Sequence, residues 1–285
     1  MHIKILTDSA SDLPLHFYKD NDVTMFPLVV QLDGQDYEDL IGIQPAQVFV
    51  AMKEGKTPKT SQVSPHHFKE VFTKLAQDKI PAIYIAFSSE LSGTYQTSIM
   101  IKAEVEEEYP DLDLTIIDTK CASLGFGMVV RAAAELSGKG ASKTDIIEAI
   151  TFNSTHMEHI FTVDDLEYLA RGGRVSKASA FVGGLLNIKP LLHVEDGKLI
   201  PLEKIRGKKK VMKRIIEIIG ERGKDLKNQT IAISHADNEE TVLELQEQLK
   251  EKFGCESFFV NTIGATIGAH AGPGTIAIFF LNETN

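Results

Sequence analysis

The stretch at residues 81–99, PAIYIAFSSELSGTYQTSI, most constrains the fold, because a short apolar run ends in a cluster of hydroxyl side chains. Residues 83–87 are apolar throughout, as in a buried strand of a parallel sheet, and a helical pattern follows. The turn between them contains Ser88, Ser89, Ser92, Gly93 and Thr94. The sequence therefore predicts an α/β fold in which a strand delivers hydroxyls to the start of a helix.

This strand-to-helix turn has the chemistry of an anion site. The start of a helix offers unpaired backbone N–H groups and a partial positive charge, and a serine hydroxyl adds a further donor. Gly93 would let a ligand approach the backbone closely. An alternative is that Ser92 is an ordinary helix N-cap, accepting from the backbone N–H of Tyr95 with nothing bound.

A second hydroxyl cluster at residues 57–65 favours the ligand interpretation. It contains Thr60 and Ser61 and also stands just before a helical pattern, so the two clusters could converge on one anionic head group. His270 lies in the glycine-rich segment 264–274, which lacks both the GKS or GKT of a P-loop and a full dinucleotide fingerprint. His270 is either a third donor to a carboxylate or a structural histidine.

Five segments together resemble the DegV family of fatty-acid-binding proteins. They cover the whole chain in order, and one departs from the usual TSQPS by placing Val63 where the proline commonly stands. The segments are TDSASDLP at the N-terminus, TSQVSP at 60–65, LSGTYQ at 91–96, LEYLARGGRVS at 166–176 and GAHAGPG at 268–274.

The resemblance implies a two-domain DegV-like fold with the ligand between the domains. We expect an N-terminal α/β domain over residues 1–158 with a mainly parallel, Rossmann-like sheet, and a C-terminal α/β domain over 159–285 with a mixed sheet. The implied ligand is a long-chain fatty acid such as palmitate, with its acyl chain in an apolar tunnel. The residues expected to hold its carboxylate are Thr60, Ser61, Ser92, Gly93, Thr94 and His270.

The resemblance also implies that the bound acid is presented to a separate fatty acid kinase, which converts the carboxylate to an acyl phosphate. The protein would then be a carrier and not the catalyst. The alternative is an enzyme using the same cleft, either a serine hydrolase with Ser92 and His270 or a phosphotransferase. Ser92 lies in LSGTY and not in GxSxG, so the strained nucleophile elbow is absent.

Composition excludes several other classes. A chain of 285 residues with 43% hydrophobic and 25% charged residues is typical of a globular protein of two domains. A formal charge of −10 argues against nucleic-acid binding. No apolar run reaches a membrane span and the N-terminus lacks a signal peptide's apolar region, so we expect a cytoplasmic protein. Cys121 and Cys255 show no metal or disulfide spacing, and we expect neither a metal nor a cofactor.

Local patterns give further expectations along the chain. Residues 24–32 are interpreted as one strand, and Asp12 as the cap of a helix with Pro14 in its first turn. Asp196 and Gly197 separate two β-patterned runs, which predicts a hairpin and hence a mixed second sheet. Residues 179–186 are small and apolar enough to pack tightly or to line a cavity.

A basic run at residues 204–214 contrasts with the acidic chain. It is either a solvated helix face or a docking surface for an acidic partner or, transiently, a membrane. The residues considered as possible partner contacts are Arg171, Arg174, Lys208, Lys209 and Lys210, and the sequence leaves open whether the two arginines touch the ligand instead.

Overall fold

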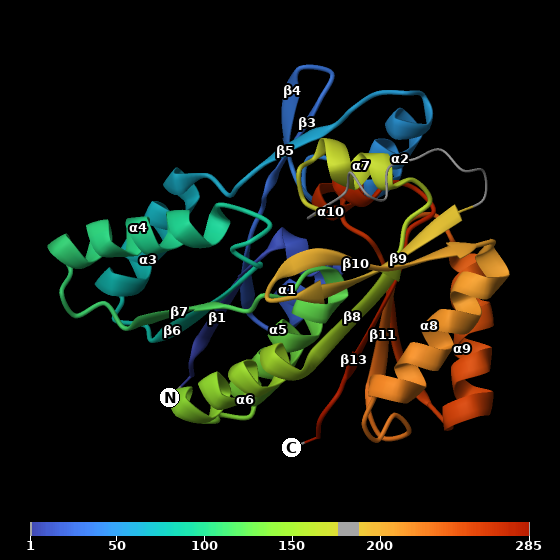
Figure 1. Cartoon of the computed structure of the whole chain (residues 1–285). Helices are drawn as coiled ribbons and strands as arrows, with labels where there is room; N and C mark the ends of the chain where they lie inside the picture. The colour runs from blue at the N-terminus through green and yellow to red at the C-terminus, as the bar shows by residue number, and fades with distance from the viewer. Residues whose placement is uncertain (1, 176–187, 285) are drawn as a thin grey trace.

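The computed structural model describes residues 2–175 and 188–284, and its N-terminal half is built on a parallel sheet (Figure 1). The four strands run in the order β2-β1-β6-β7, with all neighbouring pairs parallel. Their bounds are β1 Lys4–Asp8, β2 Val23–Phe26, β6 Ala82–Ala86 and β7 Leu114–Asp118. The apolar run at 83–87 thus becomes the central strand β6, which is buried along its whole length as predicted.

Helices cover this sheet because their apolar positions recur at helical spacing. Phe68 and Phe72 of α3 are fully buried, and their rings pack with Phe26 and Tyr84 of the sheet. The helices of this half are α1 Leu15–Asp20, α3 Pro65–Gln77, α4 Thr94–Glu108, α5 Ser123–Gly138 and α6 Lys143–His156.

The second half is built on a six-stranded sheet in the order β10-β9-β8-β13-β11-β12. Only β11 and β12 pair in parallel within the described ranges, so the sheet is mixed, as the hairpin signal predicted. Figure 1 places α8 Lys208–Arg222 and α9 Glu239–Phe253 side by side against one face. The strands are β8 Met157–Thr162, β9 Ile188–Glu195, β10 Lys198–Arg206, β11 Thr230–His235, β12 Ser257–Thr262 and β13 Ile276–Leu281.

A small third sheet was not foreseen. Residues 24–32 do not form one strand: β2 ends at Phe26, and β3 Val29–Leu32 joins an antiparallel sheet with the order β4-β3-β5. Pro27 separates the two strands, because it has no N–H to continue the first ladder. The other strands are β4 Gln35–Glu38 and β5 Lys59–Ser61, and near them lie α2 Pro45–Lys53, α7 Leu166–Arg171 and α10 Ala265–Ala271 (Figure 1).

One further local prediction is wrong. Asp12 does not cap a helix: it ends a short 3-10 turn, η1 Ser9–Ser11, in the left-handed region, and its side chain is fully buried. The glycine-rich segment 264–274, for which the sequence predicted no secondary structure, contains the helix α10. Its glycines obscure the helical pattern because they are poor helix formers.

The interpretation of residues 179–186 lies outside the described residues. The domain boundary predicted after residue 158 falls within β8 Met157–Thr162. Among the helices described here, none is both long and apolar enough to cross a membrane.

Candidate functional site

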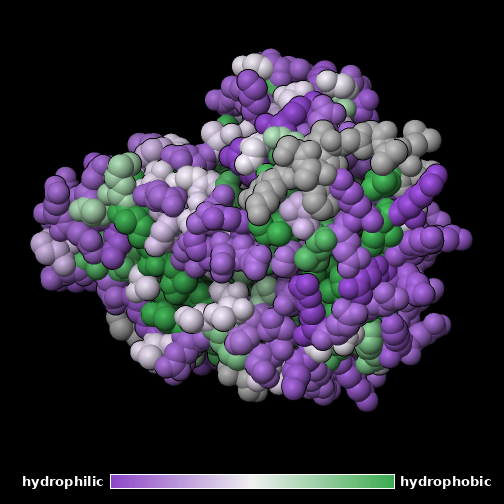
Figure 2. Space-filling model, viewed as in Figure 1, coloured by the Kyte–Doolittle hydropathy of each residue, from purple (hydrophilic) through white to green (hydrophobic). Residues whose placement is uncertain are grey.

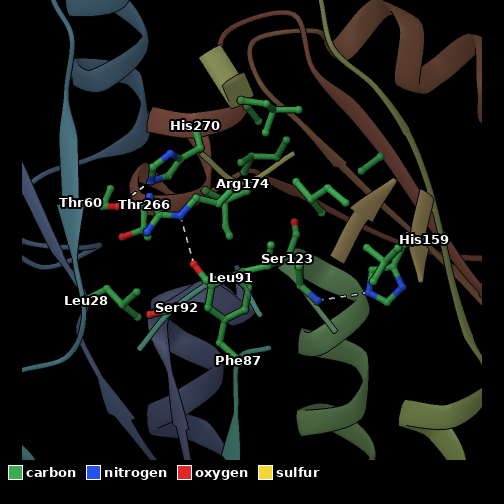
Figure 3. A pocket seen from close by; sticks show the side chains of 18 of the residues that line it. Leu28, Thr60, Phe87, Leu91, Ser92, Ser123, His159, Arg174, Thr266 and His270 are labelled. Carbon is green, nitrogen blue, oxygen red and sulfur yellow. Dashed lines mark hydrogen bonds between the residues drawn. The ribbon is translucent and has the colours of Figure 1, made fainter. Parts of the chain in front are cut away.

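A cavity of about 400 Å³ opens between the carboxyl end of the parallel sheet and the six-stranded sheet (Figure 3). Its size falls in the usual range for small-molecule sites, roughly 300 to 1,000 Å³. Polar residues gather at one end, and we call this cavity the acyl pocket. The polar wall includes Thr60, Ser61, Gln62, Ser92, Arg174 and His270; the apolar wall includes Phe87, Leu91, Phe161, Val194, Leu199 and Phe279.

The two hydroxyl clusters meet at the polar end, as the sequence predicts. The backbone N–H of Val63 donates to Thr94 Oγ1 at 3.3 Å, and Gln62 Nε2 donates to Thr97 Oγ1 at 2.6 Å. Gly93 packs closely against this contact, because a Cβ at this position would lie 2.4 Å from Gln62 Oε1 and would displace the Gln62 side chain. The segment that leads into α3 and the segment that leads into α4 therefore hold each other in place.

Thr60 and His270 form the clearest polar pair in the acyl pocket. Thr60 Oγ1 lies 2.6 Å from His270 Nε2, and both residues line the pocket wall (Figure 3). Gly172 packs against the imidazole, since a Cβ there would lie 2.2 Å from His270 Nδ1. The ring is thus fixed from both sides and presents a donor or acceptor to the pocket.

Ser92 is not the N-cap residue of α4. That position belongs to Gly93, and Ser92 Oγ accepts from the backbone N–H of Thr94 rather than from Tyr95. Ser92 Oγ also lies 2.8 Å from Thr94 Oγ1. When the Thr94 hydroxyl donates to Ser92, the Ser92 proton is left to point at a ligand. Thr94 itself is fully buried and does not line the pocket, so its place is behind Ser92.

Arg174 lies in the pocket wall, whereas Arg171 does not. The Arg174 guanidinium donates to two carbonyl oxygens, those of Leu91 at 3.2 Å and Gly172 at 2.5 Å. No carboxylate of the described residues pairs with it, so its charge is uncompensated at the polar end. Arg171 instead lies over the ring of Tyr168 and is 3.6 Å from Glu167.

His270 is neutral in this environment. Burial and the neighbouring charge of Arg174 lower the pKa of His270 from 6.5 to about 4. The surroundings of His270 therefore disfavour its protonated form, which would have offered a second positive charge to a carboxylate. The charge at this end comes from Arg174, and His270 contributes a neutral hydrogen-bonding group.

The far end of the acyl pocket is mainly apolar, and the polar residues in its lining include His159 and Ser123. Both ring nitrogens of His159 are engaged: Ala122 donates its N–H to Nε2 at 3.2 Å, and Nδ1 lies 3.0 Å from the carbonyl oxygen of Met157. Burial lowers the pKa of His159 to about 4, so this residue too is neutral. With its polar atoms satisfied, His159 presents a ring to the pocket beside Phe279.

Two buried carboxylates fix the start of α10, which carries His270. Asp12 accepts from the backbone N–H of Gly264 at 2.9 Å, and Asp39 accepts from that of Ala265 at 3.1 Å. These N–H groups have no partner inside the helix, so the carboxylates replace an ordinary cap. Asp12 also accepts from the hydroxyl of Ser123, a pocket residue. Burial raises the pKa of both carboxyls.

The geometry does not assemble a serine hydrolase. Ser92 is hydrogen-bonded to Thr94 and His270 to Thr60, and no described carboxylate orients the imidazole. Cys121 is buried, and burial raises the pKa of its thiol to about 12, which leaves it unreactive. Over the same residues, no cluster of histidine, cysteine and acidic side chains has the makeup of a metal site.

The basic run lies on β10 and α8, away from the acyl pocket. Arg214 is bound to Glu203 and Glu221 at 2.9 and 2.8 Å, so it belongs to a surface ion-pair network. Lys209 and Lys210 are exposed, and Lys208 reaches Asn238 Oδ1 at 3.4 Å. This face of the protein is largely hydrophilic (Figure 2). Its role in docking stays a prediction.

Several pocket residues carry no local sequence signal. Thr266 and Ile267 line the wall from α10, one turn before His270. Their i, i+4 spacing to His270 and Ala271 could have indicated a pocket-facing helix surface. Arg174 could not be placed, because nothing in a turn sequence says which way a side chain points.

Comparison with known proteins agrees with this architecture. The family model described as "Uncharacterised protein, DegV family" matches residues 2–283. A DegV domain-containing protein of Clostridium perfringens is 40% identical over 283 residues, covering 98% of this chain and 97% of its own. The fold and the site define an α/β protein with a pocket that is apolar along most of its wall and polar at one end. The chain belongs to the DegV family.

Two solved structures of this family resemble the chain along almost its whole length. One is a structure of a DegV family protein from Thermus thermophilus and concerns its fatty acid binding. It is 34% identical to this chain with a TM-score of 0.89, and the match covers 98% of this chain and 99% of that one. The other is DegV of Bacillus subtilis, described as a fatty acid binding protein, at 31% identity and a TM-score of 0.85, with 98% of each chain covered.

Proposed function

We propose that this protein binds a long-chain fatty acid such as palmitate in the acyl pocket. The observation that carries the proposal is the division of this pocket into an apolar length and one polar end with Thr60, Ser92, His270 and the unpaired Arg174. A fatty acid has the same division. The fatty acid binding described for the Thermus and Bacillus relatives supports it.

The carboxylate lies at the polar end, where its charge faces Arg174 and its oxygens accept from the hydroxyls of Thr60 and Ser92. Ser61 and Gly93 complete this end, and Thr94 supports Ser92 from behind. Each hydrogen bond to a charged group contributes roughly 1.5 to 3 kcal/mol. About fourteen buried methylenes contribute on the order of 11 kcal/mol before costs. The chain supplies most of the affinity and the polar end fixes the orientation.

The protein acts as a carrier that presents the bound acid to a separate fatty acid kinase, which phosphorylates the carboxylate. Two features support this reading over catalysis by the protein itself. Ser92 is hydrogen-bonded to Thr94 and His270 to Thr60, and within residues 2–175 and 188–284 no carboxylate orients the imidazole as a catalytic triad requires. The exposed lysines Lys208, Lys209 and Lys210 are the proposed contact for the kinase or, transiently, a membrane surface.

The test is direct extraction. The purified protein is denatured and the released lipid identified by mass spectrometry, with Ala277→Phe and Leu243→Phe variants in parallel. Ala277 lines the acyl pocket, whereas Leu243 is an exposed residue of α9. We expect a C14–C18 fatty acid near one equivalent from the parent and from Leu243→Phe, and much less from Ala277→Phe. Negligible fatty acid in all three would refute the function, and equal loading of all three would refute its location in the acyl pocket.

A further inference from the structure

A second cavity, of about 190 Å³, adjoins the apolar end of the acyl pocket at Phe279, the one described residue that lines both. Ala277, Phe279 and Leu281 alternate along one face of β13, and Ala277 lines the acyl pocket whereas Leu281 lines the second cavity. The helix α5 follows the same course: Ser123 at its start lines the acyl pocket, and Met128 farther along lines the second cavity. The two cavities therefore lie in one line between α5 and the six-stranded sheet, interrupted at Phe279.

The interruption is a wall of two rings held in fixed positions. The buried ring of Phe279 meets the imidazole of His159 edge to face, with the ring centres 5.3 Å apart. His159 Nε2 accepts from the Ala122 N–H at 3.2 Å (Figure 3), so the imidazole proton is on Nδ1, 3.0 Å from the Met157 carbonyl oxygen. A Cβ on Gly125 of α5 would lie 2.7 Å from Phe279 Cδ1 and 2.5 Å from His159 Nε2. An acyl chain therefore has no room to pass between α5 and the two rings.

The second cavity suits an apolar occupant. Its apolar lining residues include Met128, Ala132, Met157 and Leu281. Polar side chains of the lining are engaged elsewhere: Glu135 pairs with Lys139 at 2.7 Å, and the Arg131 guanidinium lies over the ring of Phe259. Gln229 Oε1 accepts from the backbone N–H of Leu281 at 2.7 Å. Because these groups already have partners, the cavity matches the methylenes of an acyl chain and not a second polar head group.

We propose that Phe279 sets the longest acyl chain that this protein binds: its ring ends the acyl pocket and closes off a second cavity that would otherwise hold the terminal methylenes of longer chains. This inference rests on the proposed function. Each buried methylene raises affinity roughly fourfold. An acid gains this affinity only for the methylenes that lie before the ring, and a longer acid must displace packed side chains. The protein therefore selects against acids longer than the acyl pocket.

The test lets acids of different length compete for the protein. Lipid-stripped protein is equilibrated with an equimolar mixture of saturated C14, C16, C18, C20 and C22 acids carried on phosphatidylcholine vesicles, and the bound acids are quantified by mass spectrometry. The variants are Phe279→Ala, Ala132→Phe and the two combined, because Ala132→Phe fills the second cavity. The control is Phe72→Ala, which removes a buried ring of α3 that lines neither cavity.

We expect Phe279→Ala to raise the ratio of bound C20 to bound C16 acid by at least about tenfold over the parent, because two or more further methylenes become buried. Adding Ala132→Phe should return this ratio to within about threefold of the parent value, and Ala132→Phe alone and Phe72→Ala should keep it in that range. An unchanged ratio in Phe279→Ala, an equal rise in Phe72→Ala, or a rise that survives Ala132→Phe would each overturn the role of Phe279.

Thermal melts of every variant accompany the binding data, because loss of a buried phenylalanine side chain destabilises a protein. Phe279→Leu removes less volume and should shift the C20 to C16 ratio in the same direction. It decides the question if Phe279→Ala does not fold, and an unchanged ratio in folded Phe279→Leu would then overturn the inference. A parent that binds none of the five acids would instead overturn the proposed function itself.

Discussion

Thr60 Oγ1 and His270 Nε2 lie 2.6 Å apart although 210 residues separate them in the chain. Thr60 lies in β5 in the first half, and His270 lies on α10 in the second half. The polar end of the acyl pocket therefore exists only where the two halves pack together. Substitutions at this contact test both the head-group assignment and the packing that creates it.

Replacement of the two head-group hydroxyls, Thr60→Val with Ser92→Ala, should weaken fatty-acid binding by about 100-fold or more. Two hydrogen bonds to a carboxylate, each worth roughly 1.5 to 3 kcal/mol, are lost while the apolar wall is kept. The measurement is titration with a fluorescent fatty acid, accompanied by thermal melts. Thr73→Val on the outer part of α3 is the control. Parent-like binding by the double variant would rule out this head-group assignment.

The buried strand β6 and the helices α3 and α4 could be predicted from sequence, because each depends on local pattern. Asp12 is an example of a residue whose place could not be predicted. Its spacing to Pro14 is that of a helix cap, yet its carboxyl is buried against Ser123 and Gly264, contacts that no local rule can foresee. Arg174 is similar: its place in the pocket wall depends on the carbonyl oxygens of Leu91 and Gly172, 83 and 2 residues away.

Fatty-acid affinity should be almost independent of pH between about pH 6 and pH 8. The pKa of His270 is lowered to about 4, so the imidazole is neutral across this range, and Arg174 keeps its charge. The measurement is a dissociation constant at each pH for the parent and for His270→Gln. Affinity that rises toward pH 6 in the parent but stays flat in His270→Gln would show that the ligand makes His270 cationic.

The tip of the β9–β10 hairpin closes over the first half of the protein, and Gly197 is critical to that contact. Ser88 Oγ donates to the Gly197 carbonyl oxygen at 2.8 Å, and a Cβ on Gly197 would lie 2.5 Å from Ser88 Oγ. Val194 and Leu199 beside the tip line the acyl pocket. Gly197→Ala should therefore lower both stability and fatty-acid affinity.

Gly34→Ala is the matched control for the hairpin tip. Gly34 has φ +79° and Gly197 φ +80°, but a Cβ at Gly34 meets nothing within 4 Å. Both alanines bear the left-handed strain of roughly 1 to 2 kcal/mol, and only Gly197→Ala adds the clash. Urea unfolding and ligand titration separate the two effects. Equal losses in both variants, with binding unchanged, would show that the tip contact does not shape the pocket.

Replacement by asparagine should change the stability of the protein differently at the buried residues Asp8 and Asp12. Asp8 Oδ2 accepts from the Tyr84 hydroxyl and the Phe87 N–H, and Oδ1 accepts from the Ala10 N–H, so an amide group there leaves at least one buried backbone N–H without an acceptor. Asp8→Asn should lower the free energy of unfolding by about 1 to 3 kcal/mol. In Asp12→Asn the amide can donate to the Ser123 hydroxyl while its oxygen still accepts from Gly264, so the change should stay within about 1 kcal/mol.

The same carboxyl gives a pH signature. The pKa of Asp8 is raised from 3.8 to about 7 by burial, so the folded protein holds a proton that the unfolded chain releases above pH 3.8. Stability contributed by this group is complete below pH 3.8 and is lost as the pH rises to about 7. Urea unfolding across this range should show a steeper fall for the parent than for Asp8→Asn. Parallel curves would mean that Asp8 is ionised in the folded protein.

Charge reversal of Lys208, Lys209 and Lys210 to Glu should slow kinase-dependent formation of acyl phosphate while affinity for free fatty acid stays unchanged. These lysines lie in the first turn of α8, outside the lining of the acyl pocket. Exposed clustered charge mainly raises association rates, and salt screens that attraction beyond about 8 Å at physiological strength. The slowing should therefore be largest at low salt. Reversal of Lys74, Lys79 and Lys102, on or next to α3 and α4, is the control for total charge. If the α8 triple variant keeps both the parent rate and its salt dependence, the basic run is a solvated helix face.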